Sequence, residues 1–503
     1  MGREYSDGHA SAGVLTFRIP TLKSKRREPA MAATGTKSIG ERPNFLVIMT
    51  DQQRGDCLSA AGHPVLMTPN MDAIGGAGVR FRRAYSTCPV CVPARHSFLS
   101  GQFPSIHGVL NNASVEWDAT HTLPTVLRDA GYQTEWVGRG MHQTPPLKRY
   151  GFEHMVFKDH RVRDDYDAFL ERREPEGGGG YYGTGVMHND WTARSWHMDE
   201  SLHATNWTVR EALRFLDRRD PSCPFFLTVS FIAPHPPLVP PAFYLDRYLR
   251  QDLPDPVIGD WAQPPEHGGI GDDVSAERVD LKGEALRSAR AGYYGLINHV
   301  DDQIRRLLNP VDGIQRRTGG NTVVIFLSDH GEMLGDHYRW RKSLPYEGSA
   351  HIPLMIQAPA RFGLRAGVEL DTPVCIEDLM PTILDLAGAD VPDGVDGQSL
   401  VPLMRDEGGL DRTYLHIETA PTYHCLTDGR EKYIWFVADG TEQYFDLVAD
   451  PREEHNLSTD TGRQPRVEWW RAEMIGVLQG RPEGFSDGDR LIPGRPYPGV
   501  MGQ

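Results

Sequence analysis

The feature that most constrains the fold of this chain is a series of short apolar runs separated by helical patterns. The runs are NFLVIMT (44–50), TEWVG (134–138), PFFLTVSF (224–231), TVVIFLS (322–328) and IPLMIQA (352–358). A continuous apolar run of this length is typical of a strand buried on both faces of a parallel sheet. Helical patterns occupy 285–308 and 376–388. The alternation predicts an α/β fold with a mostly parallel central sheet flanked by helices.

The pattern changes near residue 412, which divides the chain unequally. TYLHIE, HCLTD, EKYIWFVA and EQYFDLVAD resemble short antiparallel strands, and a helical pattern follows near 467–478. A chain of 503 residues is long enough for two or three domain-sized parts. We predict a disordered N-terminal tail over 1–41, a larger domain over 42–408, and a smaller C-terminal α+β subdomain over 409–503. A glycine-rich insertion is expected within the larger domain, at about 158–200.

Composition excludes several classes of protein. The net charge of −15 argues against non-specific binding to nucleic acid, because a polyanion would be repelled. No apolar run approaches the roughly 18 residues that span a membrane. The first 35 residues lack the apolar region of a secretory signal, so we expect a cytoplasmic protein. The six cysteines are scattered rather than spaced as a disulfide scaffold. Oligomeric state is left open.

Polar residues follow four of the apolar runs, where ligands of open α/β sheets bind. Any one of them could simply cap a helix or sit in a loop, but four together favour a shared site. Carboxylate and amide oxygens suit Ca²⁺ or Mg²⁺, while a nitrogen ligand leaves Mn²⁺ or Zn²⁺ open. The residues concerned are Asp51, Gln52, Asp329, His330, His235 and, after TEWVG, Arg139 to His142.

The stretch CPVCVPAR contains two cysteines, Cys88 and Cys91, whose roles we expect to differ. Pro93 suits the first turn of a helix that ends at Gly101, which places Cys91 at the helix N-terminus, where an anion or an activated nucleophile is favoured. A zinc knuckle would need a second cysteine pair nearby. A redox pair would not need the carboxylates. Cys88 is interpreted as a packed thiol.

These residues resemble the type I sulfatases. Cys91 to Arg95, followed by Leu-Ser-Gly, is similar to the family's Cys-x-Pro-x-Arg signature, whose cysteine a maturation enzyme oxidises to formylglycine. Further matches are NFLVIMTDQQ, TPNMDAI, SDHGEMLGDH with Lys342 after it, IEDLMPTILDLAG and YFDLVADPREEHNL. The resemblance covers roughly 42 to 460 in order. It implies an alkaline-phosphatase-like fold and hydrolysis of a small aryl or sugar sulfate.

The resemblance also implies roles for individual residues. Asp51, Gln52, Asp329 and His330 would be metal ligands, with the modified Cys91 completing the shell and Ca²⁺ expected before Mn²⁺, Mg²⁺ or Zn²⁺. Arg95 would stabilise the formylglycine. His235 and Lys342 would contact the sulfate and the leaving-group oxygen, and His142 would help to release sulfate.

Three departures from the family pattern keep an alternative open. Gln52 replaces a second aspartate, and His330 replaces an asparagine; both variants are similar to the phosphonate monoester hydrolase and phosphodiesterase branch. Gly140 stands where many sulfatases have a lysine; either Arg139 supplies that charge or the site is less cationic. A non-catalytic sugar-binding relative is disfavoured, because every nucleophile and metal position holds a competent residue. Candidate substrate selectors are Tyr181, Tyr182, His188, Trp191, Trp196, Arg339 to Arg341, Tyr346 and His351.

Overall fold

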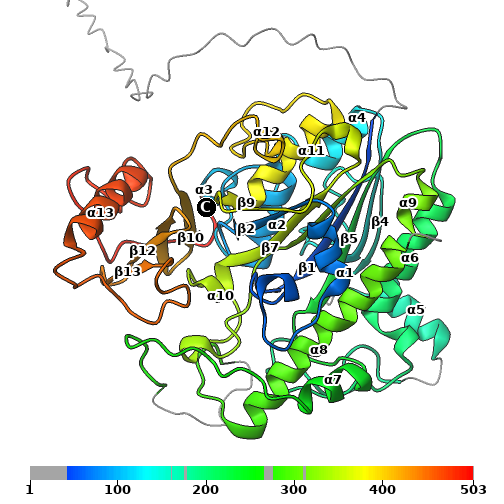
Figure 1. Ribbon diagram of the computed structural model, residues 1–503, viewed down its shortest axis with the longest axis horizontal. Helices are drawn as coiled ribbons and strands as arrows, with labels where there is room; N and C mark the ends of the chain where they lie inside the picture. The colour runs from blue at the N-terminus through cyan, green and yellow to red at the C-terminus, as the bar shows by residue number, and fades with distance from the viewer. Residues whose placement is uncertain (1–41, 160, 175–177, 266–275, 310–312, 502–503) are drawn as a thin grey trace, which may run out of the picture. The chain divides into compact units, whose positions relative to one another are not determined.

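The structure is a computed structural model that describes residues 42–159, 161–174, 178–265, 276–309 and 313–501. Residues Lys37–Gln503 form one compact unit (Figure 1). The predicted tail over 1–41 lies outside the described residues, as do residues 175–177 of the glycine-rich insertion. The predicted boundary between residues 408 and 409 falls inside this unit and stays a prediction.

A mixed, mostly parallel sheet forms the centre of the fold. Its strand order is β4-β3-β5-β1-β6-β7-β2-β8, with β9 paired to β2. Only β7 runs antiparallel to its neighbours, β6 and β2, so the predicted strand over 352–358 forms but points the opposite way. The strands are β1 Asn44–Asp51, β2 Val79–Tyr85, β3 Gln133–Arg139, β4 His154–Lys158, β5 Phe225–Pro234, β6 Thr322–Ser328, β7 His351–Gln357, β8 Val368–Leu370 and β9 Val374–Cys375.

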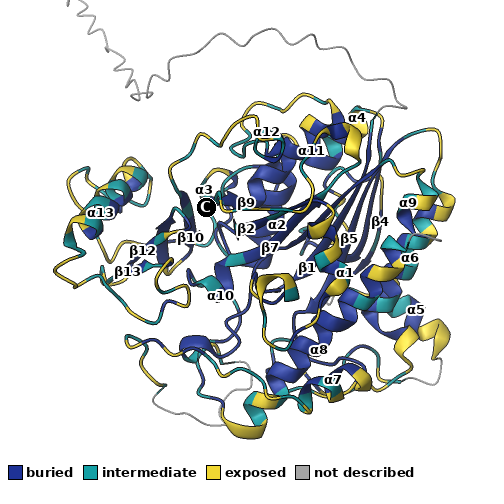
Figure 2. Cartoon of the chain, in the orientation of Figure 1, coloured by how far each residue is buried: buried dark blue, intermediate teal, exposed yellow. Residues whose placement is uncertain are grey.

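Helices cover both faces of this sheet, which is why its central strands β1, β5 and β6 are buried along their whole length and mostly apolar. In β1, Phe45, Val47 and Met49 face one hydrophobic core, and Leu46 and Ile48 face the other. The first core is covered by α2, α4 and α11, and the second by α1, α6 and α8 (Figures 1 and 2). Within the described residues, no helix is both long and apolar enough to cross a membrane.

The helices of this part of the chain are short apart from α6 and α8. Their bounds are α1 Pro69–Gly76, α2 Cys91–Ser100, α3 Pro104–His107, α4 Leu123–Asp129, α5 Asp165–Arg173, α6 Ala204–Arg218, α7 Ala242–Leu249, α8 Gly283–Leu308, α9 Ile314–Arg317, α10 Glu347–Ala350, α11 Leu379–Ala387 and α12 Val401–Arg405.

A second, antiparallel sheet follows, as the sequence predicts. Its strands β10 Leu415–Thr419, β11 Tyr423–Thr427, β12 Glu431–Phe436 and β13 Glu442–Asp446 pair in chain order. Helix α13 (Gln464–Leu478) covers one face, where Trp470 and Met474 pack with Tyr433 and Trp435. The fold is therefore an α/β sheet followed by a small α+β portion.

The histidine that caps α6 makes stability depend on pH. His203 Nδ1 accepts a hydrogen bond from Thr205 N at 3.1 Å, and burial lowers the pKa of His203 from 6.5 to about 4. The unfolded chain therefore binds a proton that the folded protein does not. The stabilisation by neutral His203 is present above pH 6.5 and is lost as the pH falls towards 4; it amounts to about 3 kcal/mol.

We expect His203→Asn to remove this pH dependence while keeping the cap, because an asparagine oxygen accepts the same hydrogen bond. Urea unfolding of both proteins between pH 7 and 4.5 should show the wild type losing more free energy of unfolding than the variant. Substitution of the exposed His121 by asparagine is the control. Parallel losses in wild type and His203→Asn would contradict the prediction.

Candidate active site

The carboxyl edge of the central sheet brings the predicted site residues together. β1 ends at Asp51, and β6 and β5 lead directly into Asp329 and His235. The two aspartates, Cys91 and His330 are all buried, and one potential ligand atom from each lies within 4.8 Å of the others. Two of the four strand ends that the sequence singled out, those of β1 and β6, therefore meet at Cys91.

Cys91 is the first residue of α2, as the sequence predicts. Val90 precedes the helix without a side-chain cap, Asn112 Oδ1 accepts a hydrogen bond from Val92 N at 3.0 Å, and Gly101 ends the helix with φ of 66°. Burial and the nearby Asp51 raise the pKa of the Cys91 thiol, but Lys342 and His330 outweigh them, so its pKa lies below the ordinary value. The position favours an anionic group.

Lys342 links the nucleophile position to two other predicted residues. Its Nζ lies 3.0 Å from Cys91 Sγ, 3.0 Å from Gln52 Oε1 and 2.9 Å from His235 Nε2. His235 Nδ1 donates to the carbonyl of Pro236 at 2.7 Å, so His235 Nε2 accepts from the ammonium group. Burial, then Lys342, lowers the pKa of His235 well below its ordinary value. His235 is therefore a neutral acceptor.

Two buried arginines hold the aspartates in place. Arg95 Nε donates to Asp329 Oδ2 at 2.9 Å, its Nη1 donates to Ser230 Oγ at 3.0 Å, and its Nη2 lies 3.3 Å from Asp51 Oδ2. Arg139 Nε donates to Asp51 Oδ2 at 2.8 Å. Both guanidinium groups are buried beside carboxylates, so the site keeps its charges paired.

The donor set fits a divalent cation. His330 Nδ1 donates to the Gly331 carbonyl at 2.9 Å, which leaves the lone pair of Nε2 directed at Cys91 Sγ, 3.2 Å away. The pKa of Asp51 lies well below its ordinary value, because the cationic groups around it outweigh burial. Two carboxylates, an imidazole nitrogen and the Gln52 amide oxygen make an oxygen-rich set of ligands.

Glu332 decides which end of the Gln52 amide faces the site. Gln52 Nε2 donates to Glu332 Oε2, which turns Gln52 Oε1 towards Lys342. The backbone N–H groups of Leu334 and Arg341 hold Glu332 Oε1. Gln52 has a φ of 73°, and its carbonyl accepts a hydrogen bond from Tyr293. Glu332 is 3% exposed, so water cannot readily replace it.

We expect Glu332→Gln to weaken cation binding by about tenfold, since loss of an outer hydrogen-bond partner typically costs 10–100-fold in metal affinity. Calorimetric titration of Ca²⁺ into the metal-stripped protein measures this directly, without turnover. Glu407 is exposed and far along the chain from the site residues, so Glu407→Gln is the control for the loss of one negative charge. Equal Ca²⁺ affinities in the two variants would show that Glu332 does not orient Gln52.

His142 lies at the edge of the site. Its Nε2 is 2.6 Å from Arg139 Nη2, and burial followed by Arg139 lowers the pKa of His142 well below its ordinary value. Arg139 thus stands between His142 and Asp51, in keeping with the expectation that Arg139 supplies the charge absent at Gly140. The predicted part of His142 in sulfate release stays a prediction.

The predicted substrate selectors divide into two groups. Tyr181, Trp191, Trp196 and Trp340 are each less than 8% exposed and belong to hydrophobic cores. His188, by contrast, stacks on His235, with ring centroids 4.6 Å apart and planes 24° apart. Part of the glycine-rich insertion therefore reaches the site through His188, although most of its aromatic residues are structural.

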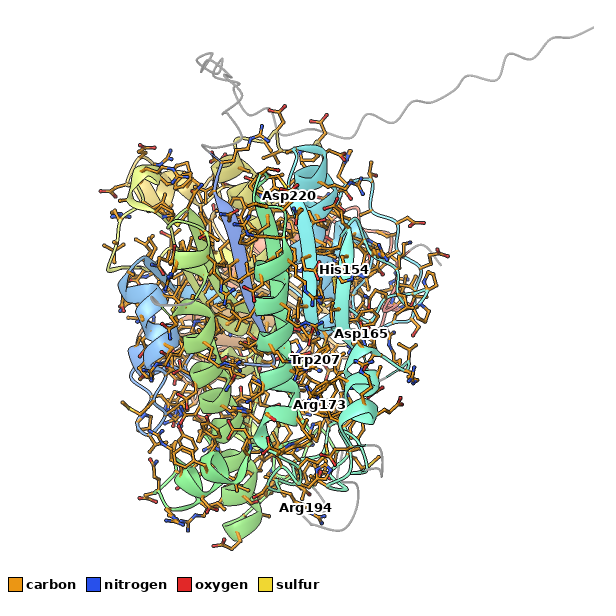
Figure 3. All side chains as sticks on the ribbon, turned by 90° about the vertical axis from the view of Figure 1, so that its right-hand side faces the viewer. His154, Asp165, Arg173, Arg194, Trp207 and Asp220 are labelled. Atoms are coloured by element: carbon orange, nitrogen blue, oxygen red, sulfur yellow. The ribbon has the colours of Figure 1, made fainter. Side chains whose placement is uncertain are left out.

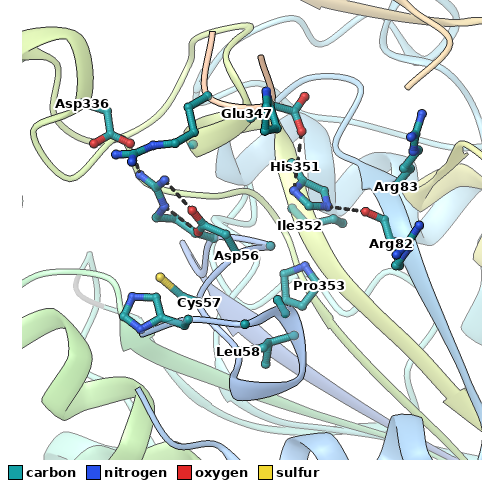
Figure 4. A pocket seen from close by; sticks show the side chains of 18 of the residues that line it. Asp56, Cys57, Leu58, Arg82, Arg83, Asp336, Glu347, His351, Ile352 and Pro353 are labelled. Carbon is teal, nitrogen blue, oxygen red and sulfur yellow. Dashed lines mark hydrogen bonds and ion pairs between the residues drawn. The ribbon is translucent and has the colours of Figure 1, made fainter. Parts of the chain in front are cut away.

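A cavity of about 610 Å³ lies beside the loop that follows β1. Its charged side chains bond largely to one another (Figure 4). Arg54 binds Asp56 and Asp336, and His351 Nε2 donates to the Arg82 carbonyl at 2.9 Å. The lining does not include Cys91. The cavity is distinct from the candidate site, and His351 lies in it rather than beside the nucleophile.

Comparisons with known proteins agree with this geometry. The family model for sulfatases matches residues 43–389, which is more than half of the chain. The chain belongs to the sulfatase family. A second family model, for the C-terminal part of N-sulphoglucosamine sulphohydrolase, matches residues 335–477.

Individual relatives place this sulfatase within the alkaline phosphatase superfamily and show it to be a sulfuric ester hydrolase. An arylsulfatase of Clostridium perfringens is 38% identical over 90% of this chain and 98% of its own length. A choline-sulfatase of Rhizobium meliloti is 33% identical over 78% of each chain. A solved phosphonate monoester hydrolase of Agrobacterium radiobacter superposes with a TM-score of 0.75 at 26% identity, covering 87% of this chain and 95% of that one.

Proposed function

We propose that this sulfatase hydrolyses aryl or carbohydrate sulfate monoesters to an alcohol and inorganic sulfate, with a formylglycine made from Cys91 as nucleophile. The observation that carries the proposal is the position of Cys91 at the N-terminus of α2, with Lys342 Nζ 3.0 Å and His330 Nε2 3.2 Å from its sulfur. The sulfur marks where an oxygen of the modified residue would lie. A formylglycine-generating enzyme must supply the modification.

A divalent cation bound by Asp51, Gln52, Asp329 and His330 would favour ionisation of the nucleophile and stabilise charge on the sulfuryl oxygens. Ca²⁺ is the proposed ion because oxygen donors predominate. Arg95 and Arg139 hold the aspartates with their oxygens converging. Because these guanidinium groups are buried, the arrangement needs little reorganisation when substrate binds.

The hydrated aldehyde offers two hydroxyl groups on one carbon. One loses its proton and attacks sulfur; a new S–O bond forms, and the S–O bond to the alcohol breaks with its electron pair leaving on the alcohol oxygen, which takes up a proton. The second hydroxyl then loses its proton, the C–O bond to sulfate breaks, and the aldehyde is restored. Water rehydrates it. A serine or thiol has no second hydroxyl, which is why residue 91 must be modified.

Lys342 and His235 are the proposed groups at the leaving oxygen. Lys342 Nζ contacts Cys91 Sγ and also donates to the neutral His235, so a proton is available beside the bond that breaks. Protonation of the departing oxygen lowers the barrier for a poor leaving group. His188 stacks on the His235 ring and restricts its orientation.

Hydrolysis of phosphonate monoesters or phosphodiesters is the second candidate. Gln52 and His330 favour it, because both residues match that branch of the superfamily, and the solved phosphonate monoester hydrolase superposes well. Sulfate monoesters differ from phosphonate monoesters and phosphodiesters in the charge of the transferred group, but the same nucleophile would attack all three. We give sulfate precedence because the curated relatives named above are sulfatases.

The test compares kcat/KM for 4-nitrophenyl sulfate, 4-nitrophenyl phenylphosphonate and bis(4-nitrophenyl) phosphate on one preparation of Cys91-modified, Ca²⁺-loaded enzyme. The proposal expects sulfate to be the best of the three after correction for the uncatalysed rates. A phosphonate or phosphodiester that exceeds sulfate by tenfold would instead support the second candidate.

A further inference from the structure

A groove of about 870 Å³ lies between α5, α6 and the strands β3 and β4, away from the nucleophile. Figure 3 shows this face, where His154, Asp165, Trp207 and Arg173 mark the groove. Its lining contains five arginines against three carboxylates, in a chain whose net charge is −15. The arginines are Arg172, Arg173, Arg210, Arg214 and Arg218. A local excess of positive charge on an acidic protein indicates a binding surface for an anion.

The groove's carboxylates already have partners. Glu211 binds Arg210 Nε at 3.2 Å and Arg214 Nη1 at 2.8 Å. Glu135 binds His154 at 2.8 Å, and Asp165 Oδ2 accepts a hydrogen bond from Phe157 N at 3.0 Å. Among the described residues, none of these carboxylates forms an ion pair with the three remaining arginines of the groove, Arg172, Arg173 and Arg218.

The spacing of the arginines on α6 is unfavourable for the protein alone. Arg210, Arg214 and Arg218 follow each other at intervals of four residues, so they form a row of like charges along one side of the helix, about 6 Å apart. Burial lowers the pKa of Arg210, and Arg173 and Arg214 lower it further, although Glu211 opposes them. The helix dipole favours a basic residue in the last turn of a helix, as Arg218 is in α6. It does not explain the arginines at 210 and 214.

Arg210 anchors the row on an apolar floor. Its guanidinium carbon lies 3.9 Å from the centroid of the Phe169 ring, and its Nη2 is buried without a hydrogen-bond partner. Arg173 approaches the same ring at 5.9 Å. Arg210 donates its Nε to Glu211 and fixes the floor of the groove, while Arg172, Arg173 and Arg218 offer planar guanidinium donors that match sulfate oxygens in pairs.

We propose that this groove is an exosite for a sulfated polysaccharide, which it holds while another sulfate ester of the same chain reaches Cys91. This rests on the proposed function, since the groove would bind the same anion that the site hydrolyses. β3 connects the two places: Glu135 lines the groove and Arg139 binds Asp51. These residues lie about 13 Å apart along the strand, so groove and site share one element of the fold, and an oligosaccharide would pass between them over the surface.

A sulfated sugar chain fits this surface better than nucleic acid does. The groove is short and has an aromatic floor, which suits a few sugar rings with sulfate groups at their edges. A long, evenly charged nucleic acid would extend beyond the groove onto a protein surface that carries excess negative charge.

The test uses the triple variant Arg172→Gln, Arg173→Gln and Arg218→Gln, because none of these three arginines forms an ion pair within the part of the chain that the structure describes. The control is Arg128→Gln, Arg250→Gln and Arg490→Gln, which changes the net charge equally elsewhere on the surface. Binding of a short dextran sulfate oligosaccharide at low salt should weaken at least tenfold in the groove variant relative to the control. Turnover of 4-nitrophenyl sulfate should be unchanged, since no substituted residue belongs to the site.

Two results would overturn the exosite. Equal affinities of the groove variant and the control for the dextran sulfate oligosaccharide would show that the groove is not the binding surface. Wild-type binding of a single-stranded oligonucleotide as tight as that of the dextran sulfate oligosaccharide would show an unselective attraction for polyanions. The binding experiment does not need turnover. Failure of the proposed sulfate chemistry would therefore appear in the substrate comparison and leave this result independent.

Discussion

Replacing Cys91 by alanine should reduce kcat for an aryl sulfate by at least about 10⁴-fold, because the variant has no group to form the covalent intermediate. KM should change little, since Lys342 and the arginines remain. Steady-state kinetics with 4-nitrophenyl sulfate, on enzyme expressed with a maturation enzyme, measures both constants. Residual activity above that level would mean that the nucleophile lies elsewhere.

The variant Cys91→Ser tests the release step of the same mechanism, and Cys88→Ala is the control for loss of a nearby thiol. Serine can attack sulfur once but has no second hydroxyl to expel sulfate, so we expect one sulfated enzyme per active site and then no turnover. Cys88 is a buried thiol 3.5 Å from the Leu110 carbonyl, so its removal should affect stability more than kcat. Full multiple turnover by Cys91→Ser would contradict the proposed release step.

Replacing Lys342 by methionine should lower kcat by about 10²–10³-fold, the usual effect of removing one preorganised group that stabilises transition-state charge. Methionine keeps much of the side-chain volume but removes the ammonium group that contacts Cys91, Gln52 and His235. The effect should grow with the pKa of the leaving phenol, because a poor leaving group depends more on a proton donor.

A series of substituted phenyl sulfates measures this dependence in wild type and Lys342→Met. Lys282→Met is the matched control, since that side chain is 79% exposed and its ion pair is with Asp280 at the surface. A constant ratio of rates across the series would assign Lys342 to sulfate binding alone and remove it from the departure step.

The central fold could be predicted because its strands are buried on both faces. Each run such as 44–50 and 322–328 is apolar throughout, and the structure places both within central strands. The direction of β7 could not be predicted, because a fully buried strand has the same apolar pattern whichever way it runs. Residues 329–350 connect β6 to β7 and are numerous enough for a parallel crossover as well, so the length of the connection does not reveal the direction either.

The site was predictable where a strand points at it. Asp51, Asp329 and His235 follow apolar runs directly, so their shared edge could be inferred. Glu332 and His188 could not, because each acts on a residue distant in sequence: Glu332 holds Gln52, and His188 stacks on His235. In the sequence, Glu332 is marked only by its position just after the predicted ligand His330, and His188 only by its place in an aromatic-rich insertion.

The chemical state of residue 91 is the most direct test of the proposed mechanism. The protein is expressed with and without a formylglycine-generating enzyme, and the peptide that contains Cys91 is analysed by mass spectrometry alongside sulfatase assays of the same samples. We predict an aldehyde in place of the thiol, with kcat rising in proportion to the modified fraction. Full activity in a preparation that carries only the unmodified thiol at residue 91 would contradict the mechanism.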